Sequence, residues 1–161
     1  MITRKPELDA SDELWKQYAR DSCVFLESRL GPFLREHFGY TERSVKRSLN
    51  VGLGSTVCAY ARKYDLYLRL FPRPQGGWPR ETIVLARILF REERKGHGRS
   101  LLSLLAELAP EIGYHHIAIE CANDNSRAFG KRFGLQTIDD GRNWLGTVSD
   151  VQRALQAPTI A

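Results

Sequence analysis

One continuous stretch of the sequence, residues 81–105, constrains the fold more than any other. Its first part, residues 82–90 (TIVLARILF), is dominated by Ile, Val, Leu and Phe. A run this short predicts a buried strand rather than a helix. The last part has helical period on a single face, which is formed by Leu101, Leu104, Leu105, Leu108 and Ile112. Between them, residues 91–100 form a basic turn with two glycines two positions apart.

The turn after this strand has the properties of an anion-binding site. The first N–H groups of a helix lack intrahelical partners, and the helix dipole places about half a positive charge there. Arg94, Lys95 and Arg99 add full charges around the same point. The alternative is a glycine-containing turn that only redirects the chain, since isolated Gly motifs are weak evidence.

Composition limits the domains, partners and compartment that we expect. The 161 residues fit one domain, 1–161, with N-terminal helices in 11–49, a sheet and cofactor-binding core in 55–148 and a tail in 150–161. No apolar stretch reaches membrane-spanning length, residues 1–6 (MITRKP) lack the apolar core expected of a signal peptide, and the cysteines form no C-x-x-C pair. We therefore expect a cytoplasmic protein with no membrane partner, disulfide framework or metal site. The net charge of +5 favours an acidic ligand or partner, such as a phosphorylated cofactor or nucleic acid.

Two helical stretches are expected before the sheet. The first begins with the cap candidate Ser11 and is expected to stop at Gly31-Pro32. The second begins at Pro32, pauses at Gly39 and resumes to about Leu49.

From residue 55 the period changes to two, which predicts an antiparallel hairpin of residues 56–62 and 66–71. The elements that follow the central strand and its helix are expected at 114–122 (strand), 123–133 (helix), 135–138 and 144–148 (strands), with a short helix from 150. This order predicts an α/β fold: a mixed sheet of six to seven strands flanked by helices. The central strand, its helix and the next strand form a right-handed crossover.

Two motifs within this order carry a family resemblance. Residues 93–98 (ERKGHG) are similar to an R/Q-x-x-G-x-G/A turn, and residues 123–135 (NDNSRAFGKRFGL) to an N-x-x-A/S-x-x-F-Y-x-x-x-G-F segment. Both are motifs of the GNAT acyltransferase superfamily, whose members use acyl-CoA, and the likeness covers roughly residues 14–148. Two positions depart from it, because Glu93 takes the first basic position and Gly130 replaces the usual tyrosine, the family's common general acid.

The resemblance implies a GNAT-like fold, acetyl-CoA or another acyl-CoA as cofactor, and N-acetyl transfer to an amine by direct attack. It implies that the CoA pyrophosphate is held by Arg94, Lys95, Gly96, His97, Gly98 and Arg99. It also implies a pantetheine arm lined by Ile88, Leu89 and Phe90 and approached by Asn123 and Ser126.

Acyl transfer needs a deprotonated amine, a stabilised oxyanion and a proton for the thiolate. Backbone N–H groups near residues 88–90 could supply the second requirement. Glu120 is the candidate base, because it lies near the end of the strand beside the central one; the alternative is a carboxylate paired with a surface Arg or Lys. The candidate acids are four tyrosines that could instead be packing residues, Tyr60, Tyr64, Tyr67 and Tyr114.

Two other functions are open at this point. Residues 32–49 resemble a helix-turn-helix, with Gly39 in the turn and a basic second helix, which would suit DNA. A catalytically inactive GNAT-like binding or regulatory module is the other, motivated by Glu93 and Gly130. The amine acceptor of an active enzyme could be a small molecule, a protein or an aminoacyl-tRNA, and exposed sheet edges suit a homodimer.

Overall fold

The computed structural model describes residues 4–120, 123–138 and 141–157 of the chain. Within these residues the helices are α1 (Asp12–Phe38), α2 (Glu42–Ser48), α3 (His97–Leu108), the 3₁₀ helix η1 (Ala109–Ile112), α4 (Asp124–Arg132) and α5 (Val148–Gln156). The strands are β1 (Leu49–Val51), β2 (Thr56–Ala61), β3 (Tyr64–Phe71), β4 (Thr82–Phe90), β5 (His116–Ile119), β6 (Gln136–Ile138) and β7 (Asn143–Thr147). No described helix is both long and apolar enough to span a membrane.

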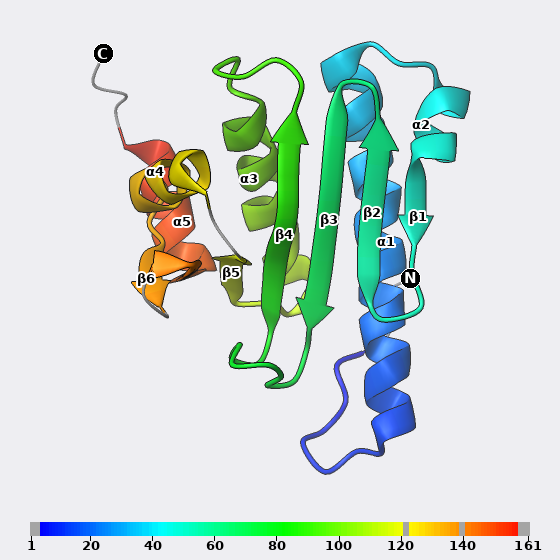
Figure 1. Ribbon diagram of the computed structural model, residues 1–161. Helices are drawn as coiled ribbons and strands as arrows, with labels where there is room; N and C mark the ends of the chain where they lie inside the picture. Colours follow the sequence, from blue (N-terminus) through cyan, green and yellow to red (C-terminus); the bar gives the residue numbers. More distant parts are fainter. Residues whose placement is uncertain (1–3, 121–122, 139–140, 158–161) are drawn as a thin grey trace.

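The seven strands form one mixed sheet in the order β1-β2-β3-β4-β5-β7-β6 (Figure 1). β4 is antiparallel to β3 on one side and parallel to β5 on the other, and the remaining pairs are antiparallel. The predicted α/β fold, a mixed sheet flanked by helices, is therefore confirmed. The predicted central strand, residues 82–90, coincides with β4.

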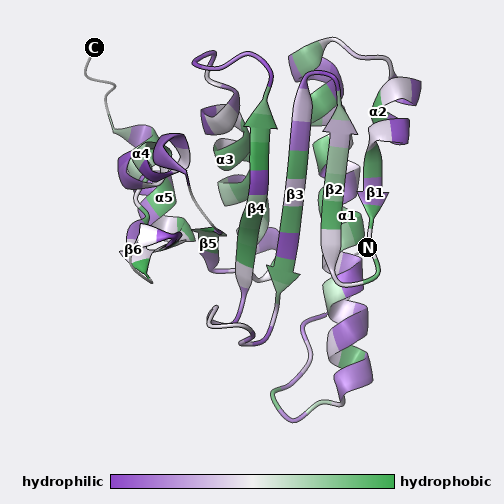
Figure 2. Cartoon of the chain, in the orientation of Figure 1, coloured by the Kyte–Doolittle hydropathy of each residue, from purple (hydrophilic) through white to green (hydrophobic). Residues whose placement is uncertain are grey.

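The main core lies on the face of the sheet covered by α1 and α3, which Figure 1 shows behind the strands. The inward side chains of β2, β3 and β4 meet there, at Val57, Leu68 and Leu85 among others. A smaller cluster on the opposite face contains Val84 and Ala118. Figure 2 shows the consequence for β4, which is mostly apolar until the chain enters a hydrophilic turn before α3.

The longest helix departs from the prediction. α1 runs through Gly31 and Pro32 without a break, so the predicted stop at that pair is wrong. An interior proline removes a main-chain N–H and disfavours a helix. A buried stripe at four-residue spacing crosses the proline and outweighs this cost, formed by Leu26, Leu30, Leu34 and Phe38. The helix ends at Gly39, whose left-handed φ of 73° closes it with a bond to the Arg35 carbonyl.

The structure does not favour a helix-turn-helix in residues 32–49. Residues 32–38 are the last turns of α1, and the seven-residue α2 leads directly into β1, a strand that the sequence did not predict. Thr41 caps α2, and its Oγ1 accepts from the Ser44 N–H at 3.1 Å. This segment therefore builds the edge of the sheet, where β1 pairs with β2.

Later elements agree more closely with the predictions. The hairpin, α3, α4, β6, β7 and a C-terminal helix all form. The predicted strand 114–122 is shorter, because β5 covers His116–Ile119 and residues 121–122 lie outside the described residues. Residues 139–140, between the predicted strands 135–138 and 144–148, lie outside them as well.

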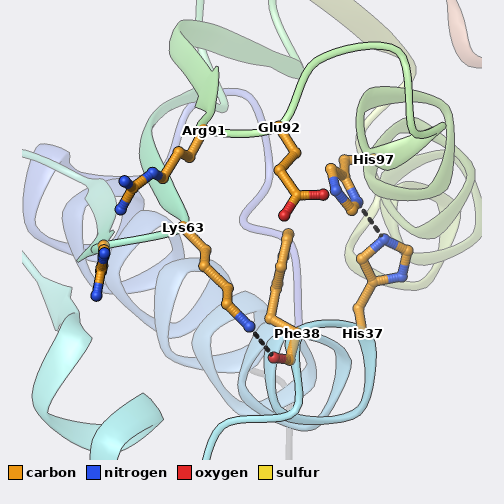
Figure 3. Close-up of a pocket in the computed structure, with 7 residues that line it drawn as sticks. His37, Phe38, Lys63, Arg91, Glu92 and His97 are labelled. Carbon is orange, nitrogen blue, oxygen red and sulfur yellow. Dashed lines mark hydrogen bonds between the residues drawn. The ribbon is translucent and has the colours of Figure 1, made fainter.

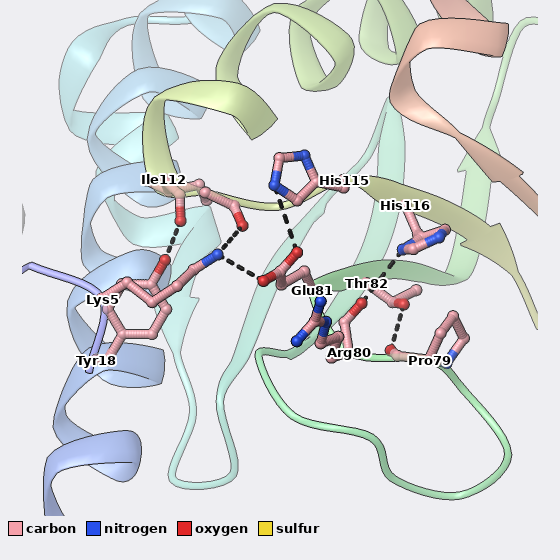
Figure 4. A network of polar contacts seen from close by, with 10 residues as sticks. Lys5, Tyr18, Pro79, Arg80, Glu81, Thr82, Ile112, His115 and His116 are labelled. Carbon is pink, nitrogen blue, oxygen red and sulfur yellow. Dashed lines mark hydrogen bonds and ion pairs between the residues drawn. The ribbon is translucent and has the colours of Figure 1, made fainter. Parts of the chain in front are cut away.

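A polar network ties the N-terminal arm to the start of the central strands (Figure 4). Lys5 Nζ lies 2.6 Å from Glu81 Oε1 and donates to the Gly113 carbonyl at 2.9 Å. The other Glu81 oxygen faces His115 Nε2 at 3.4 Å, and the Tyr18 hydroxyl donates to the Ile112 carbonyl. These contacts fix the end of the sheet opposite to the basic turn.

Two glycines with left-handed backbone give a matched test of packing near α5. Gly134 has φ 86°, and an added Cβ would lie 2.8 Å from the Asp150 carbonyl oxygen; Gly39 has nothing within 4 Å. We expect Gly39→Ala to lower the free energy of unfolding by roughly 1–2 kcal/mol, from backbone strain alone. Gly134→Ala should cost about 1–3 kcal/mol more, because backbone must move. Urea unfolding of both variants checks this, and equal losses would contradict the packing argument.

Candidate functional site

The second half of β4 has a described strand partner on one side only. β5 pairs with β4 over Thr82–Leu85, while β4 continues to Phe90 beside β3. The pairing with β3 shifts in register so that Tyr67 faces Arg87 and Leu68 faces Leu85, which leaves Ala86 as a bulge. The two parallel strands therefore part at the bulge, and residues 86–90 present main-chain groups on the β5 side.

The predicted pantetheine-lining residues all lie in this half of β4. Ile88 and Phe90 are half-buried and pack against the main core. Leu89 points to the opposite face and its side chain is 53% exposed. The predicted pantetheine site therefore consists of main-chain groups of β4 on the β5 side. The side chains of Ile88 and Phe90 support it from the face covered by α1 and α3.

The basic turn ends in an uncapped helix start. Arg94 and Gly96 have left-handed backbone, with φ of 59° and 79°, and Gly96 precedes the first residue of α3. α3 has no side-chain cap and no acidic residue in its first turn. Its first N–H groups are therefore open to an anion, and the exposed Arg94 and Lys95 flank them.

The two motif stretches meet in space. A Cβ built on Gly98 would lie 3.0 Å from Cε2 of Phe129, so the glycine lets α4 approach the start of α3. Asn123 caps α4, and its side-chain oxygen accepts from the Ser126 N–H at 2.9 Å. The predicted cofactor-binding pair Asn123 and Ser126 thus lies at the N-terminal end of the helix that packs on Gly98.

Two other residues of the predicted pyrophosphate set face elsewhere. The Arg99 guanidinium donates to the Leu155 carbonyl at 2.7 Å and lies over the Phe133 ring. His97 Nδ1 is 2.7 Å from His37 Nε2, on the α1 side of the turn (Figure 3). The side chains that flank the open helix start are therefore those of Arg94 and Lys95, and those of Arg99 and His97 have other partners.

Glu120 lies where β4 and β5 part. Its N–H donates to the Leu85 carbonyl at 3.2 Å, and its carboxylate accepts from Arg69 Nη1 at 3.1 and 2.9 Å. Glu120 and Arg69 also line an open hollow of about 580 Å³, together with Tyr67 and the bulge residue Ala86. The carboxylate is therefore ion-paired, as the alternative interpretation of the sequence proposed, and is also accessible beside the bulge.

Only one of the four candidate tyrosines shares this hollow. Tyr67 lines it, whereas Tyr64 is buried with its hydroxyl 2.7 Å from Ser48 Oγ. Tyr114 is buried and stacked on Tyr18, and Tyr60 is 73% exposed. Burial raises the pKa of both Tyr64 and Tyr114 above the ordinary value, which disfavours their ionisation.

The missing tyrosine of the second motif has a structural explanation. A Cβ on Gly130 would lie 3.4 Å from the indole of Trp144, so this ring lies against the position where a larger side chain would begin. The Trp144 Nε1–H donates to the Gly141 carbonyl at 3.2 Å, which holds the ring there. Sequence reasoning identified the substitution at Gly130 but not its partner, because residues 130 and 144 lie on different elements.

Two central parallel strands that part, a basic turn and an open helix start make up the candidate site. No family model and no curated relative matches the sequence. Among solved structures, the chain is similar to a Staphylococcus aureus Mu50 acetyltransferase of the GNAT family, with 11% identity over 88% of this chain and 97% of the other (TM-score 0.45).

Two further similarities have the same level of identity. An aminoglycoside 6′-acetyltransferase type Ii matches at 15% identity over 78% of this chain and 91% of the other, with a TM-score of 0.42. A mutant of the toxin AtaT, bound to the C-terminus of the antitoxin AtaR and to acetyl-CoA, matches at 12% identity over 63% and 71% (TM-score 0.45). All three TM-scores are below 0.5, so we infer function from the residues and topology of this chain.

His97 makes the stability of the helix start depend on pH. Burial and the adjacent His37 lower the pKa of His97 below 6.5. The unfolded chain therefore takes up this proton first as the pH falls, and the folded state loses stability from about pH 6.5 downward, until His97 itself protonates. We expect His97→Gln to lose less stability than the parent protein between about pH 7 and pH 5.5, measured by urea unfolding.

The same pH series on His116→Gln controls for the removal of an imidazole at the other end of the sheet. An identical pH dependence of the parent protein and His97→Gln would contradict the role assigned to the His37–His97 pair.

Proposed function

We propose that this protein binds an acyl-CoA, acetyl-CoA in the simplest case, and transfers the acyl group to an amine. The observation that carries the proposal is the parting of β4 and β5 at Ala86, with an uncapped helix start at one end of the open edge and a carboxylate at the other.

The open helix start fits a pyrophosphate. It offers main-chain N–H groups, the positive end of a helix dipole and two flanking cations, Arg94 and Lys95. Gly96 leaves the approach clear, because nothing lies within 4 Å of the position a Cβ would take. We assign the pyrophosphate to these groups, without Arg99.

The open edge of β4 fits the arm between pyrophosphate and thioester. Residues 86–90 span roughly 16 Å at about 3.3 Å per residue, a length that an extended pantetheine arm can follow. Pantetheine contains amide groups, which can pair with main-chain N–H and C=O groups along this edge. Asn123 and Ser126 at the start of α4 are assigned to the opposite side of the arm.

The hollow beside the bulge fits the acceptor amine. When bound, the thioester supplies an electrophilic carbonyl, and the amine displaces the CoA thiolate with release of one proton. Glu120 is placed to accept that proton, and Arg69 holds its carboxylate in position. Tyr67 lines the same hollow and is the candidate donor to the thiolate, in place of the tyrosine absent at Gly130.

Acetyl-CoA binding tests the assignment of the turn. We expect calorimetric titration to detect acetyl-CoA, and Gly96→Asp to weaken binding at least about tenfold, because a carboxylate at the helix cap repels the pyrophosphate. Gly96→Asn is the matched neutral control, and both residue types tolerate left-handed backbone. Failure of the folded parent protein to bind millimolar acetyl-CoA would overturn the proposed function.

The acid–base step is tested at Glu120. We expect Glu120→Gln to lower kcat/KM by about 10²–10⁴-fold with an amine acceptor, since the amide cannot accept the proton. Acetyl-CoA affinity should be unchanged, because the hollow lies at the far end of the open edge from the basic turn. Thr56→Val, which alters the same hollow without touching the ion pair, is the control variant. Unchanged turnover in Glu120→Gln would remove the carboxylate from the mechanism.

A further inference from the structure

A second cationic site lies on the other side of the basic turn. A partly open cavity of about 460 Å³ lies between the end of α1, the β2–β3 turn, the end of β4 and the start of α3 (Figure 3). Arg62, Lys63 and Arg91 line it, together with the histidine pair. The volume falls in the range of small-molecule sites.

This cavity is separate from the proposed acyl-CoA edge. The Arg91 N–H donates to the Lys63 carbonyl at 3.0 Å, so the cavity is on the β3 side of β4, whereas the open edge is on the β5 side. Two consecutive residues of α3 also face these two different sides. His97 faces α1 through His37, and Gly98 faces α4 through Phe129.

The cationic side chains of the cavity differ in whether they have protein hydrogen-bond partners. Lys63 Nζ donates to the Phe38 carbonyl at 3.0 Å and lies 5.4 Å from the centre of the Tyr40 ring. The exposed guanidinium groups of Arg62 and Arg91 make no hydrogen bond or ion pair with any residue that the structure describes. Two planar donors with free ends at one cavity suit an oxyanion, which each can bind through two N–H groups.

The histidine pair can contribute a further positive charge to the cavity by taking up a proton. His37 Nε2 and His97 Nδ1 share one hydrogen bond, so one of them donates and the other accepts. When both imidazoles are neutral, one of the two remaining ring nitrogens, His37 Nδ1 or His97 Nε2, therefore carries no proton. The charged groups around His97 are Glu92 and Lys95 from the turn, with Arg62, Lys63 and Arg91 across the cavity. Burial and the neighbouring His37 lower the pKa of His97, and an anion among these groups would favour the protonated form of His97.

We propose that this cavity binds a phosphate-type dianion, either a phosphate monoester or a pyrophosphate group, through Arg62, Arg91 and the His37–His97 pair. One carboxylate, Glu92, faces three cationic side chains there, so the cavity carries net positive charge before the pair takes up a proton. The site does not depend on acyl-CoA binding.

Histidine NMR tests the proposal, because the chain has four histidines. His37 and His97 line the cavity, and His115 and His116 lie at the opposite end of the sheet beside Glu81 and Arg80. We expect inorganic pyrophosphate to shift the imidazole C–H signals of His37 and His97 saturably and to leave those of His115 and His116 in place.

Three paired variants separate the sites. Arg62→Ala with Arg91→Ala should weaken the response of the pair at least about tenfold, since two charge-assisted contacts are lost. Arg43→Ala with Arg47→Ala removes the same charge from the exposed face of α2 and should keep the full response. Arg94→Ala with Lys95→Ala should weaken acetyl-CoA binding and leave the pyrophosphate response of the pair.

Sulfate, which keeps its charge over this range, should bind more tightly at about pH 5.5 than at about pH 8, because binding is linked to protonation of His97. Equal shifts of all four histidines, or a response lost in the Arg94 and Lys95 variant but kept in the Arg62 and Arg91 variant, would overturn the proposal. Loss of acetyl-CoA binding with the histidine response intact would refute only the proposed transferase function.

Discussion

The parting of two parallel strands is the constraint on which the rest of the site depends. A strand inside a sheet satisfies its main-chain groups through the strands on both sides. Among the residues that the structure describes, the second half of β4 has such a strand on the β3 side only. The bulge at Ala86 lets β4 keep its pairing with β3 while its direction relative to β5 changes. The exposed edge is tolerated because the opposite pairing and the apolar backing of Ile88 and Phe90 hold β4 in place.

An aromatic cluster then fixes the turn at the end of this edge. Phe38, at the end of α1, packs against Tyr64, Phe90 and His97 with ring centroids 5.2, 5.9 and 4.8 Å away. Such pairs contribute about 0.5–1.5 kcal/mol each beyond the area they bury. The position of the first turn of α3 is therefore set by the length of α1, since a helix that stopped at Gly31 would not deliver Phe38 to the sheet.

This dependence explains which parts of the fold could be predicted from sequence. Residues 82–90 were predicted correctly as β4 because a dense apolar run has one simple solution, burial in a central strand. The pair Gly31-Pro32 is a local breaker signal that does not end the helix, because the buried stripe from Leu26 to Phe38 overrides it. The bulge at Ala86 was not predictable, because the residue has no unusual chemistry and only the register with β3 defines it.

The candidate site was predictable to a similar degree. The open helix start follows from two glycines and a strand-to-helix order, and Glu120 follows from its place after β5. The partners of Arg99, Glu120 and His97 could not be predicted, because Leu155, Arg69 and His37 are at least 51 residues away in sequence. The partner of Arg99 changes the interpretation most. The motif alone assigns Arg99 to the pyrophosphate, but its guanidinium is bound to α5 instead.

The alternation of His97 and Gly98 has a further physical consequence for the turn. His97 contacts His37 of α1, whereas Gly98 allows Phe129 of α4 to approach. The start of α3 therefore borders two separate cationic regions, the cavity with Arg62 and Arg91 and the turn with Arg94 and Lys95. Both regions lie near the positive end of the same helix dipole, which favours an anion in each. The net charge of +5 is therefore better understood from how these cations are divided around α3 than as a general affinity for acidic partners.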